Sequence, residues 1–374
     1  MVGGGPGSYV AGFHRKAAGL DEEIELVAGA FSSKPEKSYE MGKILCLNPE
    51  RVYGSYKEMA QREAGLPDGE KLDFVSIVTP NYLHFPVAKE FILKGFNILC
   101  DKPLVMDLNE ATELLKLVKK HDVLFAVTYN YTGYPMAKQA KEMIRQGMLG
   151  DILKVIVEYL CNYVPVNTDI KSIKKDFWRL DPARVGSSSC LADLGSHAEN
   201  LSNYVTGLKI ERVFADLKSF VSGCELENDA TILLQYKNGA KGSITQSQVL
   251  TGEENNLNIR VYGSKASLAW YQNNPAVLSV RFLDKPEVLF KANNDYLEPL
   301  VKNSTRLPPG HPEAFIEAFA NIYRNFARTV RARKYMEEAG PFDNDFPTIE
   351  DGYSGMNFID KVIKSFKTSS WVDI

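Results

Sequence analysis

The chain of 374 residues has few cysteines, no excess of one charge and no apolar run long enough to cross a membrane. Its five cysteines are odd in number and widely spaced, without a Cys-x-x-Cys pair, so neither a disulfide framework nor a zinc site is expected. We interpret them as reduced core thiols. The 44 basic and 47 acidic residues give a net charge of -3 without a block of either sign, which argues against nucleic acid or an anionic membrane as the main partner.

The N-terminus carries a glycine loop, where a signal peptide would need an apolar segment. Together with the reduced cysteines, this predicts a soluble protein of a reducing compartment, the cytoplasm. The length and the 44% hydrophobic content allow a large core, and the usual size of a domain favours two domains.

Strand-like and helical patterns alternate in the first third of the chain. The helical patterns include residues 84–94 and 109–120, the second with Asp107 or Asn109 as a candidate cap. The strand-like runs are residues 24–30, 73–79, 96–100 and 123–128. This alternation is typical of an α/β domain with a parallel, doubly wound sheet, which we predict at residues 1–128.

From about residue 152 the pattern changes to consecutive strands. Alternating side chains in residues 231–236 indicate an antiparallel sheet with one buried face and one face available to a helix or a partner. The strand-like stretches are residues 153–159, 210–221, 230–236, 239–248, 256–262 and 267–271. We therefore predict an α+β domain at residues 129–374 with a large open, mainly antiparallel sheet, and helices at residues 313–333 and 355–367.

A glycine-rich segment begins at the third residue. Its glycines would let the backbone approach a pyrophosphate, and the N-terminus of the following helix would direct free N–H groups at that anion. The candidate cofactor-binding residues here are Gly3, Gly5, Gly7, Ser8 and Tyr9. A mobile N-terminal tail is the alternative interpretation. Because only Met1 and Val2 precede the loop, either very few residues supply the central strand or the chain lacks its own.

Polar residues follow each strand-like run of the first domain. Because the carboxyl ends of parallel strands meet at one edge of the sheet, these residues predict a binding crevice. The clusters are Ser32-Ser33-Lys34, Thr79-Pro80-Asn81-Tyr82-Leu83-His84, Asp101-Lys102-Pro103 and Asn130-Tyr131.

The first of these clusters bears on the choice of cofactor. A site that prefers NAD usually has an acid here for the ribose hydroxyl, whereas positive charge favours the 2′-phosphate of NADP. This chain has Ser32, Ser33 and Lys34 and no acid, so we lean slightly towards NADP. An ordinary solvated turn before a helix at Pro35 fits the same residues.

Lys102 is a candidate catalytic residue. It follows an apolar strand and precedes Pro103, which ends the strand and forces a turn where the ammonium is presented. A lysine in this position opens into the crevice and is placed to handle a proton. A strand-ending Lys-Pro that merely faces water is the alternative.

Asp193 and His197 form the second candidate group. Their spacing of four places them on one face of a helix, where the carboxylate can orient the imidazole or stabilise its charged form. Imidazole titrates near neutrality, which suits a base that takes a hydroxyl proton and returns it. A structural Asp-His pair is the alternative. We propose no metal site, and we assign His311 to a surface loop.

The ordered combination of the glycine loop, Asp101-Lys102-Pro103 and Asp193-Leu194-Gly195-Ser196-His197 resembles a known family. This is the glucose-fructose oxidoreductase, inositol dehydrogenase and rhizopine catabolism (Gfo/Idh/MocA) family of oxidoreductases, and the resemblance extends from Gly3 to at least the helix after Pro312. It implies an N-terminal Rossmann domain and a C-terminal sheet that binds the substrate and commonly mediates homodimers or homotetramers. Asp101 departs from the glutamate that the family usually has.

The resemblance implies NAD or NADP as cofactor and reversible hydride transfer at a hydroxyl-bearing carbon of a sugar, polyol or inositol-like substrate. His197 would remove the hydroxyl proton, Lys102 would hold and polarise the oxygen, and Asp193 would steady the imidazole. Further cofactor contacts are expected at Ser32, Ser33, Lys34, Thr79, Pro80, Asn81, His84, Asp101, Lys102, Asn130, Trp178 and Arg179. Substrate contacts are expected at Lys102, Tyr131, Tyr163, Arg179, Asp193 and His197.

Two other functions remain open from the sequence. Some relatives of the family use a tightly held NAD as a transient oxidant to cleave glycosidic bonds, returning the hydride so that no net redox occurs. A non-catalytic NAD(P)-binding protein is the third hypothesis, and the short first strand prompts it.

Overall fold

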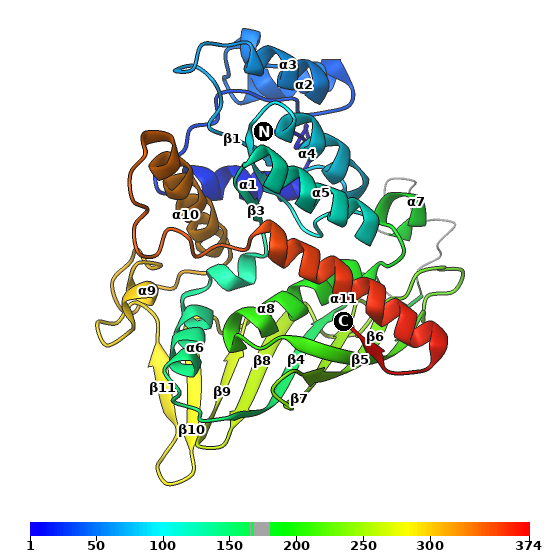
Figure 1. The fold of residues 1–374 in the computed structure, drawn as a ribbon, viewed down its shortest axis with the longest axis vertical. Helices are drawn as coiled ribbons and strands as arrows, with labels where there is room; N and C mark the ends of the chain where they lie inside the picture. Colours follow the sequence, from blue (N-terminus) through cyan, green and yellow to red (C-terminus); the bar gives the residue numbers. More distant parts are fainter. Residues whose placement is uncertain (165, 168–179) are drawn as a thin grey trace. The chain divides into compact units, whose positions relative to one another are not determined.

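The computed structural model describes residues 1–164, 166–167 and 180–374. The chain folds into two compact units (Figure 1). Unit 1 comprises residues 1–130 and 315–353, and unit 2 comprises residues 131–314 and 354–374. The chain therefore returns to the first unit after completing most of the second. The sequence patterns indicated a boundary after residue 128 but not this return.

Unit 1 is built on a parallel sheet with helices on both faces. The strands pair in the order β1 (Phe74–Ile77), β2 (Asn97–Cys100) and β3 (Phe125–Val127). The helices and short turns are α1 (Tyr9–Gly19), α2 (Pro35–Ile44), η1 (Pro49–Arg51), α3 (Tyr56–Ala64), η2 (Asn81–Leu83), α4 (His84–Ile92), α5 (Leu108–His121), η3 (Asn130–Gly133), α10 (Phe315–Tyr335) and α11 (Ile349–Thr368). Of these, η3 and α11 continue into unit 2. Helices α1 and α10 pack together, and Figure 1 shows α4 and α5 on the side of the sheet away from α10.

Val2 fills the centre of this sheet. Its N–H donates to Ser76 O at 2.8 Å, and its carbonyl accepts from Val78 N at 2.9 Å. On the other side, Gly3 N donates to Ala30 O at 2.9 Å. Of the two alternatives, the first is therefore confirmed: very few residues supply the central strand. The short first strand therefore no longer argues for a non-catalytic NAD(P)-binding protein.

The predicted strand over residues 24–30 is wrong in its extent. Among the described residues of this segment, bridging is confined to Gly29 and Ala30, which pair with Val52 and Val2. A β-ladder needs a neighbour along its whole length. Within residues 24–30, the neighbouring residues 1–3 hydrogen-bond only with Ala28 and Ala30.

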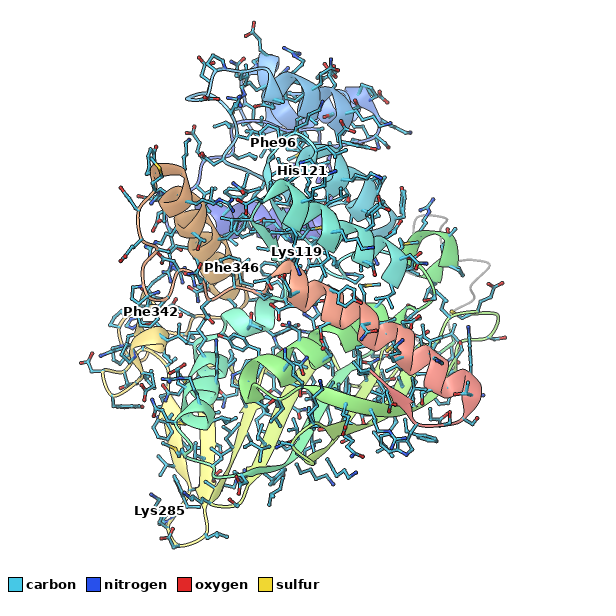
Figure 2. The ribbon with its side chains drawn as sticks, viewed as in Figure 1. Phe96, Lys119, His121, Lys285, Phe342 and Phe346 are labelled. Atoms are coloured by element: carbon cyan, nitrogen blue, oxygen red, sulfur yellow. The ribbon has the colours of Figure 1, made fainter. Side chains whose placement is uncertain are left out.

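The returning helix α10 closes the core of unit 1. Its residues Phe319, Tyr323 and Phe326 pack with Leu99 of β2. Phe346, labelled in Figure 2, packs edge-on against Phe326 with ring centroids 5.4 Å apart. Full burial of one large apolar side chain stabilises a fold by about 1.5–3 kcal/mol. The packing therefore makes this late segment part of the first unit's core.

Unit 2 is built on a nine-stranded sheet in the order β11-β10-β9-β8-β4-β7-β6-β5-β12. The strands are β4 (Ile152–Cys161), β5 (Ile210–Lys218), β6 (Asp229–Tyr236), β7 (Lys241–Ser247), β8 (Asn255–Gly263), β9 (Ala266–Tyr271), β10 (Val277–Phe282), β11 (Val288–Lys291) and β12 (Val372–Asp373). Neighbouring strands are antiparallel except β4 and β7, which are parallel. The other elements are α6 (Pro135–Arg145), α7 (Pro182–Val185), the π-helical turn η5 (Leu191–Gly195), α8 (Ser196–Thr206) and α9 (Pro299–Lys302). In Figure 1, α6, α8 and the end of α11 cover one face of this sheet.

The predicted fold class is confirmed in both units. A parallel, doubly wound sheet is followed by an α+β region with a large, mainly antiparallel sheet. The cysteine prediction is only partly right. Cys100, Cys161 and Cys190 are buried, but Cys46 is exposed in the turn after α2.

Candidate active site

The glycine loop lies at the carboxyl edge of the parallel sheet, directly before α1. Gly3 has a φ of +89°, and a Cβ at this position would lie 2.7 Å from Val78 O, so a side chain does not fit. A Cβ on Gly5 would lie 3.1 Å from Phe31 O and 3.5 Å from Ser32 Cβ. The bare backbone and the N-terminus of α1 form a cradle that fits the pyrophosphate of a dinucleotide.

Of the predicted strand-end clusters of unit 1, those that contain Ser32 and Thr79 lie against this loop. A Cβ on Gly3 would come within 3.0 Å of Thr79 Cγ2. The buried ring of His84 joins two of the turns, since its Nε2 lies 2.9 Å from Thr79 O and its Nδ1 lies 2.8 Å from Pro103 O. His84 therefore ties the turn after β1 to the turn after β2.

Asp101 organises the turn that carries Lys102. Its Oδ1 accepts hydrogen bonds from Lys102 N and from Thr128 Oγ1, both at 2.8 Å. Its backbone N–H donates to Ile77 O at 2.9 Å. The peptide bond between Lys102 and Pro103 is cis. The carboxylate thus links the ends of β2 and β3 at the point where Lys102 begins its turn.

Residues from two other predicted clusters border the same edge of unit 1. Ser32 lies beside Gly5, and its Oγ accepts from Lys34 N at 3.2 Å, while Ser33 and Lys34 are exposed. Asn130 is buried at the start of η3, and its Nδ2 donor has no hydrogen-bond partner among the described residues. The structure therefore places the Ser32 turn beside the cradle and the Asn130 amide donor just after β3.

In unit 2, His197 lies near the start of α8 against two tyrosine rings. Its ring centroid is 4.8 Å from that of Tyr131 and 6.2 Å from that of Tyr159, both edge-on. The hydroxyls of Tyr131 and Tyr159 lie 2.6 Å apart, Tyr159 OH donates to Asn255 Oδ1 at 2.8 Å, and Asn255 Nδ2 donates to Tyr131 OH at 3.1 Å. This closed triangle requires Tyr131 to donate to Tyr159.

The two tyrosines support His197 as neutral groups. Burial raises the pKa of Tyr131 to about 12, and burial also raises the pKa of Tyr159 well above its usual range. Both phenols therefore keep their protons near neutral pH, so neither is a suitable general base. Tyr131, which we expected to contact the substrate, has this supporting contact with the histidine as well.

Asp193 lies in η5, immediately before α8. The Tyr163 hydroxyl donates a hydrogen bond to Asp193 Oδ2. The same hydroxyl accepts a hydrogen bond from Gln248 Nε2 at 2.5 Å. These bonds join two of the predicted substrate contacts, Tyr163 and Asp193. Asp193 belongs to the π-helical turn η5 and His197 to α8, which follows it directly from Ser196, so the two residues lie on consecutive helical turns. That their side chains share a face stays a prediction. π-helical turns are frequent at functional sites.

Glu227 fixes the beginning of this turn. Its Oε1 accepts from Leu191 N at 2.9 Å and from Ser188 Oγ at 2.6 Å, and Ser188 Oγ accepts in turn from Ala192 N at 3.2 Å. Burial raises the pKa of Glu227, while these hydrogen bonds oppose the shift. The serine run before Asp193 thus serves as a cap.

The sequence analysis did not identify four residues of this arrangement. They are Tyr159, Glu227, Gln248 and Asn255. Tyr159 could have been found, because a tyrosine at an inward-facing position of a strand needs a hydrogen-bond partner for its buried hydroxyl. The other three are isolated polar residues whose partners lie on other elements.

Gly195, at the end of η5, is expected to tolerate no side chain. A Cβ would lie 2.6 Å from Gln246 Oε1 and 2.7 Å from its Nε2, and Gln246 is fully buried on β7. Overpacking of this kind costs about 1–3 kcal/mol, so Gly195→Ala should unfold at a lower temperature and turn over more slowly. Gly12→Ala is the matched control, because a Cβ on Gly12 meets open space in α1. Equal melting temperatures for the two variants would contradict this packing.

Several expectations lie outside these contacts. Trp178 and Arg179 fall outside the described residues. Among residues 1–164, 166–167 and 180–374, no group of His, Cys, Asp or Glu is arranged to hold a metal ion. Across the same ranges, no helix has the length and apolar character needed to cross a membrane.

The parallel sheet and its glycine cradle define a dinucleotide-binding protein, and comparisons with known proteins extend this class. Residues 1–129 match the family model described as an oxidoreductase family with an NAD-binding Rossmann fold. Residues 137–269 match the GFO/IDH/MocA C-terminal domain. The class is therefore an NAD-binding oxidoreductase.

Similar proteins cover the whole chain. The uncharacterized oxidoreductase YfiI of Bacillus subtilis is 34% identical over 100% of this chain and 95% of its own. The structure of an oxidoreductase from Sinorhizobium meliloti is 40% identical with a TM-score of 0.89, covering 100% and 98% of the two chains. An inositol dehydrogenase homologue from Azotobacter vinelandii, solved with NADH and myo-inositol, is 32% identical with a TM-score of 0.91, covering 100% and 96%.

The chain belongs to the Gfo/Idh/MocA family of oxidoreductases. The predicted family and the predicted activity class, a dehydrogenase or oxidoreductase acting on CH–OH groups, are confirmed.

Proposed function

We propose that the protein transfers a hydride between nicotinamide and a hydroxyl-bearing carbon of an inositol, a sugar or another polyol. One observation carries the proposal. Lys102 and the Asp193 and His197 pair occur in a chain that resembles, over its whole length, the homologue solved with NADH and myo-inositol. Hydrogen bonds also fix the backbone next to these residues: Asp101 accepts from Lys102 N, and Glu227 accepts from Leu191 N at the start of η5.

Each proposed catalytic residue has a distinct role. A bound dinucleotide would supply the hydride acceptor or donor. His197, packed against Tyr131 and Tyr159, would take the proton from the substrate hydroxyl and return it in the reverse direction. Lys102 would donate a hydrogen bond to the same oxygen as negative charge develops there. Asp193, oriented by Tyr163, would favour the charged imidazole.

We further propose that residues 1–128 hold the dinucleotide and that residues 129–374 supply most substrate contacts. The pyrophosphate would lie on the cradle of Gly3, Gly5, Gly7, Ser8 and Tyr9, and the bare backbone of Gly3 and Gly5 supports the assignment. The turns that border the cradle would complete the cofactor site. They contribute Thr79, Pro80, Asn81, His84, Asp101 and Asn130.

Lys34 is proposed to favour NADP, since it is exposed in the turn beside Gly5 that includes the Ser32 and Ser33 hydroxyls. Lys34→Ala should weaken NADP binding about tenfold and leave NAD binding unchanged, because only NADP carries the 2′-phosphate. Calorimetric titration of both dinucleotides measures this, with Lys37→Ala of α2 as the matched exposed control. Identical effects of the two substitutions would assign the segment to an ordinary solvated turn.

A homodimer or homotetramer through the nine-stranded sheet is also proposed. The sheet carries exposed apolar side chains such as Leu233 on β6, which is 45% exposed. Light scattering would give a monomeric mass if this proposal is wrong.

The free thiols support the cytoplasm as the compartment.

The test of the function is a panel of polyols and sugars that includes myo-inositol, each mixed with NAD and with NADP. Accumulation of reduced cofactor supports the dehydrogenase. Release of a sugar without reduced cofactor would support a glycosidase instead. No reaction with any member would contradict both.

A further inference from the structure

A line of buried side chains in unit 1 runs behind the turn that carries Lys102. Ser76 Oγ lies 2.7 Å from Tyr323 OH, and Tyr323 OH lies 2.8 Å from His14 Nδ1. On the far side of the imidazole, His14 Nε2 is 3.8 Å from Asp101 Oδ2. The line joins β1, α10 and α1 to the carboxylate that accepts the backbone N–H of Lys102. The proposed chemistry does not use any of its three inner members.

His14 faces Asp101 with a nitrogen that lacks a hydrogen bond. The side chain is fully buried, and Nε2 has no partner among the described residues. Burial lowers the pKa of His14, although the charge of Asp101 opposes the shift, so the ring is neutral near pH 7 with a single N–H. When Tyr323 donates to Nδ1, that N–H lies on Nε2 and points to the carboxylate.

The distance from His14 Nε2 to Asp101 Oδ2 exceeds that of a hydrogen bond by less than the length of one C–C bond. A charge-assisted N–H···O contact is about 2.8 Å long, which leaves about 1 Å of the observed 3.8 Å. A C–C bond measures about 1.5 Å, so a carboxylate longer by one methylene can close the gap. Asp101 meanwhile uses its other oxygen to hold Lys102 N and Thr128 Oγ1.

We propose that His14 is a positioning residue for Lys102. Held by Tyr323 and Ser76, it directs an N–H at the Asp101 carboxylate and limits the motion of the turn that presents the lysine. The aspartate leaves this contact loose, and a glutamate would tighten it. The inference rests on the catalytic role proposed above for Lys102.

The first test is a thermal unfolding cycle that needs no activity. Asp101→Glu should raise the melting temperature by about 2 °C when His14 is present, because a new bond forms to a buried donor. The same substitution should bring no gain in His14→Phe, whose ring can still pack edge-on against Phe319 as the imidazole does, with centroids 4.9 Å apart. Equal shifts in the two backgrounds, or a loss in both, would overturn the contact.

The second test separates positioning from folding. Tyr323→Phe removes one buried hydroxyl and should lower kcat about tenfold, while the dissociation constants of NAD and NADP stay unchanged. Tyr53→Phe is the matched control, since Tyr53 is equally buried in unit 1 but donates to Glu63, away from the line. The assay uses the panel polyol that the wild type oxidises fastest. Equal kcat values for the two variants would overturn the proposal.

The two proposals fail separately. A fully active Lys102→Met variant would refute the catalytic role, whereas an inactive Lys102→Met with normal Tyr323→Phe would refute the positioning role alone. The unfolding cycle decides the His14 contact in either case.

Discussion

Replacing Lys102 with methionine is expected to stop turnover while dinucleotide affinity stays within about twofold of the wild type. Methionine keeps an unbranched apolar side chain but has no N–H to donate to the substrate oxygen. Loss of one such donor typically lowers kcat about 10²–10³-fold. Rates of cofactor reduction and calorimetric titration measure the two quantities.

The matched control for this substitution is Lys94→Met. Lys94 is exposed just after α4, in the same unit as Lys102. Ordinary rates in Lys102→Met would remove the lysine from the chemistry. A selective loss of cofactor affinity would instead make it a binding residue.

His197→Phe is expected to lower kcat about 10²–10⁴-fold, the usual contribution of a general base. Phenylalanine keeps an aromatic ring against Tyr131 and Tyr159, so the packing is largely retained while the proton acceptor is lost. His311→Phe, in an exposed loop, is the control and should be fully active. A His197→Phe enzyme with a normal melting temperature and near-normal kcat would show that the base lies elsewhere.

The fold could be predicted where the signal is local. The period of two in residues 231–236 and the alternation of strands and helices near the N-terminus reflect burial of nearby side chains, and both sheets were found. Pairing partners and destinations are not local. The helix after Pro312 was expected, yet only the packing of Phe319 and Phe326 on Leu99 shows that it completes the first unit.

The same limit applies to the candidate site. Lys102 and His197 were found because their motifs are short and contiguous. Sequence patterns could not reveal the hydrogen-bonded triangle of Tyr131, Tyr159 and Asn255, because Asn255 comes from a strand far along the chain. His14 stood in the sequence beside the glycine loop without an assignable role, because its partner Tyr323 lies 309 positions away.

The most direct test of hydride transfer uses myo-inositol, or the most active polyol of the panel, with deuterium on its hydroxyl-bearing carbons. After one turnover, mass spectrometry should find the deuterium on the reduced nicotinamide of the wild type and none with Lys102→Met. Deuterium that remains on, or returns to, the carbohydrate while the cofactor stays unlabelled would contradict net oxidation of the substrate by this protein.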